Sequence, residues 1–330
     1  MRTRNIIYAH VDGKEKKMSA KLSSSNGQST ESQIMSSPKK TKKKLYGSTS
    51  VWYIFLIPSF LGILLFMVYP IFESLRLSFF KSNGTIESFI GLKNFRYILT
   101  SHTFWNSVWN TFYIGFFQII ITIPLGFIFA SLINTARKGQ NFFKVIYFLP
   151  NVTSIVAAAM IFAFVLHPDM GIVNYVLDAI GLPTPGWLAD PSTSKWAVIL
   201  LAVWHWIGFV IIICLANLQA ISSEMYEAAK IDGAGGIQQW LFITIPNMGS
   251  TFAFLLITGW IGALQRFNEV YVLGGSNGSP ARSIQTMGAY IYERGFKGFE
   301  FGVASAATYI MFIIILIFTF FNLKVSKMKL

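Results

Sequence analysis

The chain has 330 residues, of which 53% are hydrophobic and only 12% are charged, against about 25% charged in an average soluble domain. This composition excludes an ordinary water-soluble fold, because 31 Phe and nine Trp exceed what one core needs and the excess is expected to face lipid. The formal net charge is +13, but residues 1–50 hold eleven Lys or Arg against three acidic residues, so the basic charge indicates a tail and excludes a folded nucleic-acid-binding surface.

The N-terminal residues 1–50 are predicted to form a basic, disordered cytoplasmic tail. Residues 19–44 are rich in Ser and Lys and have few apolar side chains to bury, so they cannot offset the entropy lost on ordering.

Six uncharged, apolar runs follow, each long enough to cross a bilayer. They cover residues 51–72, 108–133, 145–166, 196–218, 247–265 and 303–323. Each run is continuously apolar and does not alternate with period two, which favours helices over a barrel. The predicted fold is therefore all-α, a polytopic bundle of six transmembrane helices within one domain, residues 51–330.

Basic residues outside the spans predict the orientation. If both termini are cytoplasmic, the inner segments carry 18 Lys or Arg and the outer segments carry eight, as the positive-inside rule requires. This topology leaves external segments near residues 73–107, 167–195 and 266–302. It also leaves one long internal loop, residues 219–246, far longer than a simple reversal of the chain needs.

The internal loop is predicted to contain a short helix. Ser222 or Ser223 can cap its N-terminus, Glu224 and Glu227 lie in the first turns where the helix dipole favours acidic groups, and Gly233 helps to end it. A second helical stretch, residues 237–245, leads to Pro246 at the entry of the fifth span.

This loop resembles the EAA loop of ABC-importer permeases. The pattern is Glu227-Ala228-Ala229, three residues, Gly233, nine residues, Ile243, one residue, and Ile245-Pro246. The family usually has Leu where this chain has Ile245. The likeness extends over residues 51–330 and is strongest to the larger permease subunit of maltose and oligosaccharide importers. It is carried by stretches such as FLPN (148–151), WLADPSTSKW (187–196) and RFNEVYVLGGSNGSP (266–280).

The resemblance implies a set of partners in a bacterial cell membrane. They are a second, homologous permease subunit that completes a heterodimer, two ABC ATPase subunits, and an extracytoplasmic solute-binding protein that delivers an oligosaccharide. External segments 73–107 and 269–300 are expected to dock that protein. The chain has no GxxxxGK[ST] motif, so it is not expected to be an enzyme; no cofactor is expected on it, and ATP and Mg are expected on the ATPase.

The resemblance also implies which residues couple the permease to the ATPase. The loop helix is expected to sit in a cleft of the ATPase, with Glu227 meeting a basic residue and Met225, Tyr226 and Ala229 filling the apolar part. The whole expected coupling set is Glu224, Met225, Tyr226, Glu227, Ala228, Ala229, Asp232, Gly233, Ile243 and Pro246.

A sugar pathway needs aromatic faces beside hydrogen-bonding groups, and two places in the sequence have both. The fourth span carries the Trp204–Phe209 segment above Asn217 and Gln219, and Trp260 and Glu269 flank the end of the fifth. By resemblance, the pathway residues are Trp204, His205, Trp206, Phe209, Gln265, Arg266 and Asn268. Arg266 has two open explanations: it contacts an acidic or phosphorylated substrate, such as a glycerol phosphate or polyol phosphate, or it pairs with Glu269.

Other function classes fit the sequence less well. An ion-coupled secondary sugar transporter commonly keeps acidic groups near the membrane midplane, whereas no Asp, Glu, Lys or Arg lies inside the six spans. An intramembrane protease of the zinc type would need an HExxH motif, which does not occur, and the hydroxyl residues and the one histidine in the spans form no recognisable set of nucleophile, base and orienting group. A metal site is not expected, because the one cysteine, Cys214, excludes a CxxC site and the histidines lack ligand spacing.

Overall fold

The computed structural model describes residues 49–136 and 139–327. The predicted tail, residues 1–50, therefore lies almost wholly outside the described residues. The chain divides into two units, the first ending at Phe60 and the second running from Leu61 to the C-terminus. Most of helix α2 (Thr49–Ile63) belongs to the first unit.

The second unit is almost entirely helical, with one small two-stranded hairpin. Its elements after α2 are η1 (Leu64–Val68), α3 (Tyr69–Ser78), β1 (Phe80–Ser82), β2 (Glu87–Phe89), α4 (Lys93–Thr100), α5 (His102–Thr135), α6 (Gln140–Val152), α7 (Ile155–Val165), α8 (Ile172–Ala179), η2 (Trp187–Ala189), α9 (Ser194–Leu218), α10 (Ser223–Ile231), α11 (Gly236–Gln239), η3 (Trp240–Thr244), α12 (Ile245–Asn247), α13 (Gly249–Leu264), α14 (Asn268–Gly274), α15 (Met287–Tyr292), η4 (Glu293–Lys297) and α16 (Phe301–Lys327).

Four described helices are long and apolar enough to cross a membrane by themselves: residues 55–78, α5, α9 and α16. Two bent pairs, α6 with α7 and residues 236–247 with α13, raise the number to six if each pair counts as one span. The predicted fold class, a helical membrane bundle, is confirmed. The hairpin of β1 and β2, which pairs Phe80 with Phe89 in antiparallel register, was not predicted.

The third predicted span, residues 145–166, is not one continuous helix. The structure breaks it into α6 and α7, whose axes meet at 94°. Pro150 has no N–H to donate, Thr153 and Ser154 are extended, and the Ser154 hydroxyl accepts from the N–H of Ala157 at 3.5 Å to cap α7. One helix therefore ends two residues after Pro150 and another begins after Ser154, inside a single apolar run.

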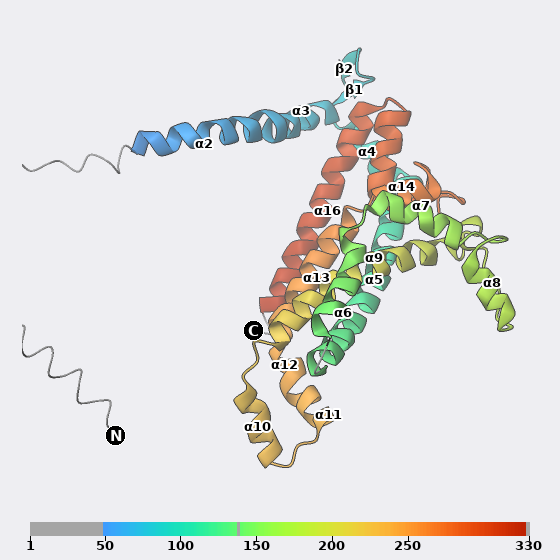
Figure 1. The fold of residues 1–330 in the computed structure, drawn as a ribbon. Helices are drawn as coiled ribbons and strands as arrows, with labels where there is room; N and C mark the ends of the chain where they lie inside the picture. Colours follow the sequence, from blue (N-terminus) through green and yellow to red (C-terminus); the bar gives the residue numbers. More distant parts are fainter. Residues whose placement is uncertain (1–48, 137–138, 328–330) are drawn as a thin grey trace, which may run out of the picture. The chain divides into compact units, whose positions relative to one another are not determined.

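Helices α5, α9 and α13 form the centre of the bundle and run side by side in Figure 1. Small residues let them approach closely, as is common between membrane helices. A Cβ on Gly126 of α5 would lie 2.5 Å from a methyl carbon of Val210, and a Cβ on Gly259 of α13 would lie 2.7 Å from the Trp206 ring. On α9, a Cβ on Gly208 would lie only 1.9 Å from the carbonyl oxygen of Tyr147 in α6.

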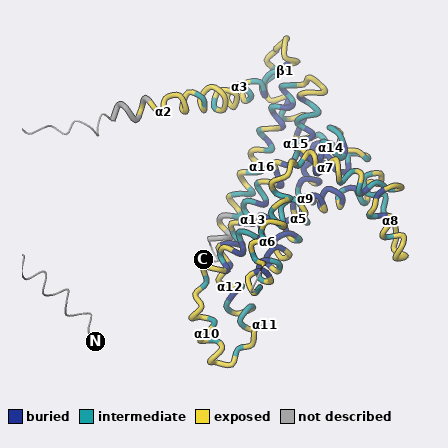
Figure 2. The backbone as a smooth tube through the Cα atoms, viewed as in Figure 1, coloured by how far each residue is buried: buried dark blue, intermediate teal, exposed yellow. Residues whose placement is uncertain are grey.

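Burial separates the centre of this unit from its edges. Buried residues line α5 and α9, whereas α8, α10 and α11 are exposed along most of their length (Figure 2). The long helices also keep large apolar side chains exposed, among them Ile120, Phe164, Leu316 and Phe320, which is expected of surfaces that meet lipid or another subunit. Helices α10 and α11 lie at one end of the bundle, and α4 and the hairpin lie at the opposite end (Figure 1).

Candidate functional site

The loop between α9 and α13 forms two short helices joined by a compact turn. The Ser222 hydroxyl accepts from the N–H of Glu224 at 3.3 Å and caps α10, as the sequence predicts. At the other end the N–H of Gly233 donates to Lys230 O and the N–H of Ala234 donates to Ala229 O, at 3.1 and 2.8 Å. These two bonds form a Schellman motif, and Gly233 occupies its left-handed position with φ +83°.

The turn passes directly into the second helical stretch. Gln238 accepts from the N–H of Gly235 at 2.8 Å, and the Gln239 amide donates to Ala234 O at 2.8 Å. Helix then continues from Gly236 to Asn247, two residues past the predicted end, and meets α13 at 59°. Because both sides of the turn are tied by hydrogen bonds, α10 and this second stretch can transmit a displacement from one to the other.

A side-chain contact joins the two stretches away from the turn. The Tyr226 hydroxyl lies 3.0 Å from the Thr244 hydroxyl. The second stretch is joined in turn to α5: the Trp240 indole donates to Ser131 Oγ at 3.1 Å, and its ring stacks on Phe127 with centroids 5.2 Å apart. A continuous set of contacts therefore runs from α10 to the centre of the bundle.

Most of the expected coupling residues are exposed, and one of the others, Tyr226, contacts the second helical stretch. Glu224, Met225, Glu227, Ala228, Asp232, Gly233 and Pro246 are exposed, whereas Tyr226, Ala229 and Ile243 are half-buried. The Met225 side chain, 43% exposed, offers an apolar contact beside two carboxylates. Thr244, which holds Tyr226, was missed by sequence reasoning; a hydroxyl next to Ile245-Pro246 carries no signal for a contact 18 residues away.

The aromatic segment of α9 divides between two sides of the helix. Trp204 packs against Phe162 of α7 with ring centroids 5.3 Å apart, and Trp206 stacks near Phe209 at 6.2 Å. The His205 ring lies 3.4 Å from Thr153 O, and Asn151 donates to His205 O at 3.4 Å. His205 thus braces the break between α6 and α7, where a backbone carbonyl lacks a helical partner.

Two other residues singled out in the fourth and fifth spans, Asn217 and Trp260, contact neighbouring helices. Asn217 of α9 donates to Thr251 Oγ1 of α13 at 2.5 Å, whereas Gln219 is exposed at the end of α9. The Trp260 ring packs between Phe112 of α5 and Phe318 of α16. Trp260 and Asn217 therefore hold helices together.

Arg266 forms an ion pair with Glu269. This is the second of the two roles that the sequence left open for Arg266. Both residues are 8% exposed; the guanidinium donates to the Glu269 carboxylate and to the Gln118 amide oxygen near the middle of α5. Its Nε is buried without a hydrogen-bond partner among the described residues. The neighbouring Gln265 and Asn268 are exposed. Sequence reasoning missed Gln118, although an amide within an apolar run is itself a signal.

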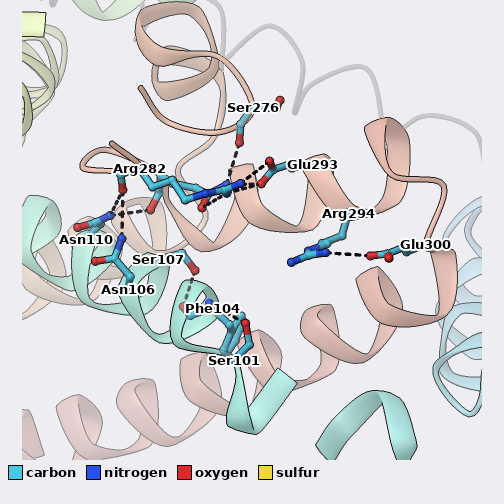
Figure 3. A network of polar contacts seen from close by, with 11 residues as sticks. Ser101, Phe104, Asn106, Ser107, Asn110, Ser276, Arg282, Glu293, Arg294 and Glu300 are labelled. Atoms are coloured by element: carbon cyan, nitrogen blue, oxygen red, sulfur yellow. Dashed lines mark hydrogen bonds and ion pairs between the residues drawn. The ribbon is translucent and has the colours of Figure 1, made fainter. Parts of the chain in front are cut away.

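A polar network fixes the segment after α14 (Figure 3). Arg282 donates to Glu293 at 2.7 and 3.0 Å and to Gln285 at 2.9 Å, and Gln285 donates to Glu293 at 2.6 Å. On the other side, amides of Asn106 and Asn110 in α5 donate to Arg282 O at 3.2 and 2.9 Å. Burial raises the pKa of Glu293, but hydrogen bonds from Arg282 and Gln285 outweigh it, so this pKa lies below its usual range.

A cavity of about 740 Å³ lies beside the hairpin at the same end of the bundle. It is lined by Lys81, Ser82, Asn83, Ile86, Ser88, Ile90, Lys93, Asn94, Tyr97, Gly298, Phe299, Glu300, Gly302 and Val303. Lys81 and Lys93 are exposed and form no ion pair with any described residue, whereas Glu300 pairs with Arg294 at 3.1 Å. The cavity therefore favours an acidic group. Across residues 49–136 and 139–327, no group of three or more His, Cys, Asp or Glu could hold a metal ion.

The family model and the relatives that this chain matches are all membrane components of transport systems. Residues 122–328 match the family model described as "Binding-protein-dependent transport system inner membrane component". The chain is 33% identical over 297 residues to the lactose transport system permease protein LacF of Rhizobium radiobacter, covering 89% of this chain and 99% of LacF. It is 33% identical over 283 residues to the arabinooligosaccharides transport system permease protein AraP of Bacillus subtilis, covering 85% and 90%.

Among solved structures, the chain is similar to one in a crystal structure of a bacterial alginate ABC transporter in complex with an alginate pentasaccharide-bound periplasmic protein. The TM-score is 0.72 at 26% sequence identity, covering 83% of this chain and 92% of the other.

Proposed function

Since the chain belongs to the family of binding-protein-dependent transport system inner membrane components, a family of membrane-embedded ABC transport permeases, we propose that it forms half of the pathway of a sugar importer. A second, homologous permease supplies the other half, two ABC ATPases bind ATP and Mg, and an extracytoplasmic protein delivers the sugar. Both termini are cytoplasmic, as the distribution of Lys and Arg favours. The sugar is an oligosaccharide, as the names of the relatives suggest.

The observation that supports this proposal best is that helix α10 is exposed and yet held in place by several hydrogen bonds. A helix with so many exposed residues contributes little to the bundle, yet capping, a Schellman turn and the Tyr226–Thr244 contact hold it in place. Seated in a cleft of an ATPase, α10 moves as a rigid body when the ATPases close on ATP. Residues 236–247 then pass the motion to α5 and α13, which turns the pathway from inward- to outward-facing.

The proposed sugar pathway uses Trp204, His205, Trp206, Phe209, Gln265 and Asn268. Aromatic faces of α9 stack on sugar rings, and the exposed amides of Gln265 and Asn268 bond to hydroxyl groups. Arg266 takes no part in this pathway, because its guanidinium is engaged by Glu269 and Gln118.

The external end is proposed to dock the binding protein over residues 73–107 and 269–300. The cavity beside the hairpin is the point at which Lys81 and Lys93 attract an acidic surface group of that protein.

The experiment is reconstitution of the full complex in liposomes, with uptake of radiolabelled sugar and ATP hydrolysis measured together. We expect uptake only with ATP and the loaded binding protein. Glu227→Gln should weaken attachment of the ATPase and lower uptake, whereas Lys230→Gln, an exposed neighbour on the same helix, should not. Uptake that continues without ATPase subunits would overturn the proposal.

A further inference from the structure

Among the residues that the structure describes, Arg266 and Glu269 are the charged pair buried within the bundle. Among the described membrane-crossing helices, Asp, Glu, Lys and Arg occur only toward the ends: Glu73, Arg76, Lys144, Lys195, Lys324 and Lys327. Arg266 and Glu269 follow the fifth span, and both are about nine-tenths buried. Arg266 reaches Gln118 near the middle of α5, and Glu269 pairs with Arg266.

These two charges cancel each other. The guanidinium donates to the Glu269 carboxylate through Nη1 and to Gln118 through Nη2, and Nε is enclosed by protein atoms. Because Arg266 is only 8% exposed and already donates to Glu269 and Gln118, a cargo carboxylate or phosphate could reach the guanidinium only by rearranging this pair. An acid taken into a low-dielectric pathway needs an available cation, because an unpaired charge is costly there.

We infer that this chain's half of the pathway is built for an uncharged sugar, and that Arg266 is a positioning residue that ties the end of α13 to α5. The inference rests on the proposed sugar-import function and narrows its cargo. It excludes phosphorylated polyols and acidic oligosaccharides, although the structure with a TM-score of 0.72 belongs to an alginate transporter. Neutral hydroxyl groups need only the amides of Gln265 and Asn268 and the aromatic faces of α9.

The test compares the uptake of neutral and acidic probes by the reconstituted complex, and then the effect of removing each charge of the Arg266–Glu269 pair. The probes are lactose, trehalose and arabinotetraose as neutral sugars, and glycerol 3-phosphate and tetragalacturonate as acidic ones. Binding of each probe to the binding protein is measured first by calorimetry, and uptake is then measured for each probe that binds. We expect uptake of neutral probes only.

The variants separate a structural ion pair from a substrate contact. Arg266→Gln and Glu269→Gln each leave one buried charge uncompensated, so each should lower uptake of the neutral probe by about tenfold or more. The double variant removes both charges and should recover uptake to within about threefold of the unaltered complex, because the two effects are coupled. Co-purification of all subunits separates lost assembly from lost transport.

Three outcomes would count against the inference or the function beneath it. Uptake of an acidic probe by the unaltered complex overturns the inference. A double variant as inactive as Arg266→Gln also overturns it, since Arg266 would then act on the cargo. If the assembled complex hydrolyses ATP but imports no probe of either kind, the sugar-import function itself fails.

Discussion

The hydroxyl of Tyr226 on α10 lies 3.0 Å from the hydroxyl of Thr244, 18 residues further along the chain. This is a side-chain bond between α10 and the stretch that leads into α13. Tyr226→Phe removes it and leaves the ring, so we expect a cost of about 1 kcal/mol, which corresponds to about a fivefold loss if the bond is required for transport. Uptake per ATP hydrolysed measures the coupling.

Thr244→Val removes the other hydroxyl of the same bond and allows a double-mutant test. If the bond acts as a unit, Thr244→Val and the double variant should lower coupling no further than Tyr226→Phe alone. Additive losses would show that the two hydroxyls act separately.

Gly233 has a conformation that other residues adopt at a cost. Its φ is +83°, so Gly233→Val strains the turn by about 1–2 kcal/mol, although a Cβ would meet nothing within 4 Å. We expect the complex to assemble but to hydrolyse ATP with little uptake, because α10 is no longer held at a fixed angle. Gly235→Ala is the control, since its φ is −71°; equal uptake by both variants would argue against a coupling role for the turn.

Gly208 lets α9 contact the backbone of α6. Since a Cβ would lie 1.9 Å from Tyr147 O, Gly208→Ala must push the helices apart, and we expect a loss of about 1–3 kcal/mol. Gly262 of α13 has no atom within 4 Å of a Cβ, so Gly262→Ala should be neutral or stabilising by about 1 kcal/mol. Thermal unfolding in detergent compares the two, and a common direction of change would contradict this packing.

Lys81 and Lys93 can be tested by charge reversal. Lys81→Glu with Lys93→Glu should slow association of the binding protein about tenfold and make the rate less sensitive to salt, because rim charges act mainly on encounter. Surface capture of the complex in lipid discs gives the rate. Arg96→Glu, on the same helix as Lys93 but outside the cavity lining, should change it less; an equal effect would indicate long-range attraction and not a defined docking cavity.

Glu293 gives a pH dependence with a definite sign. Its folded-state pKa is lowered, mainly because bonds from Arg282 and Gln285 outweigh burial. Its contribution to stability is therefore present above the unfolded carboxyl pKa, about 4.3, and is lost as the pH falls through the lower folded value. We expect Glu293→Gln to destabilise the protein by about 1 kcal/mol at pH 7, and by less below pH 4. A pH-independent difference in melting temperature would contradict this.

Continuous apolar runs predicted the helical class and most long helices, because lipid permits few alternatives for exposed backbone. The loop helix was also predictable, since Ser222 and Gly233 act locally at its two ends. A kink near Pro150 follows from the proline itself. The size of the bend, 94°, did not follow, because hydropathy does not register a turn within an apolar run.

Long-range pairings lay beyond the sequence. Glu269 is one turn from Arg266, so that pair was a recognised alternative. Gln118, by contrast, is 148 residues away from Arg266, and nothing local connects them. The Arg282–Glu293 network likewise depends on how the segment after α14 packs on α5. Contacts of this kind follow from tertiary packing and not from local pattern.

The break between α6 and α7 has a consequence for biogenesis. His205 of α9 contacts Thr153 O, and α6 approaches α9 closely at Gly208, yet α9 is synthesised later. During membrane insertion the bent segment therefore reaches lipid before its supporting helix exists. The contacts that hold the bend of residues 140–165 can therefore form only after α9 has been made.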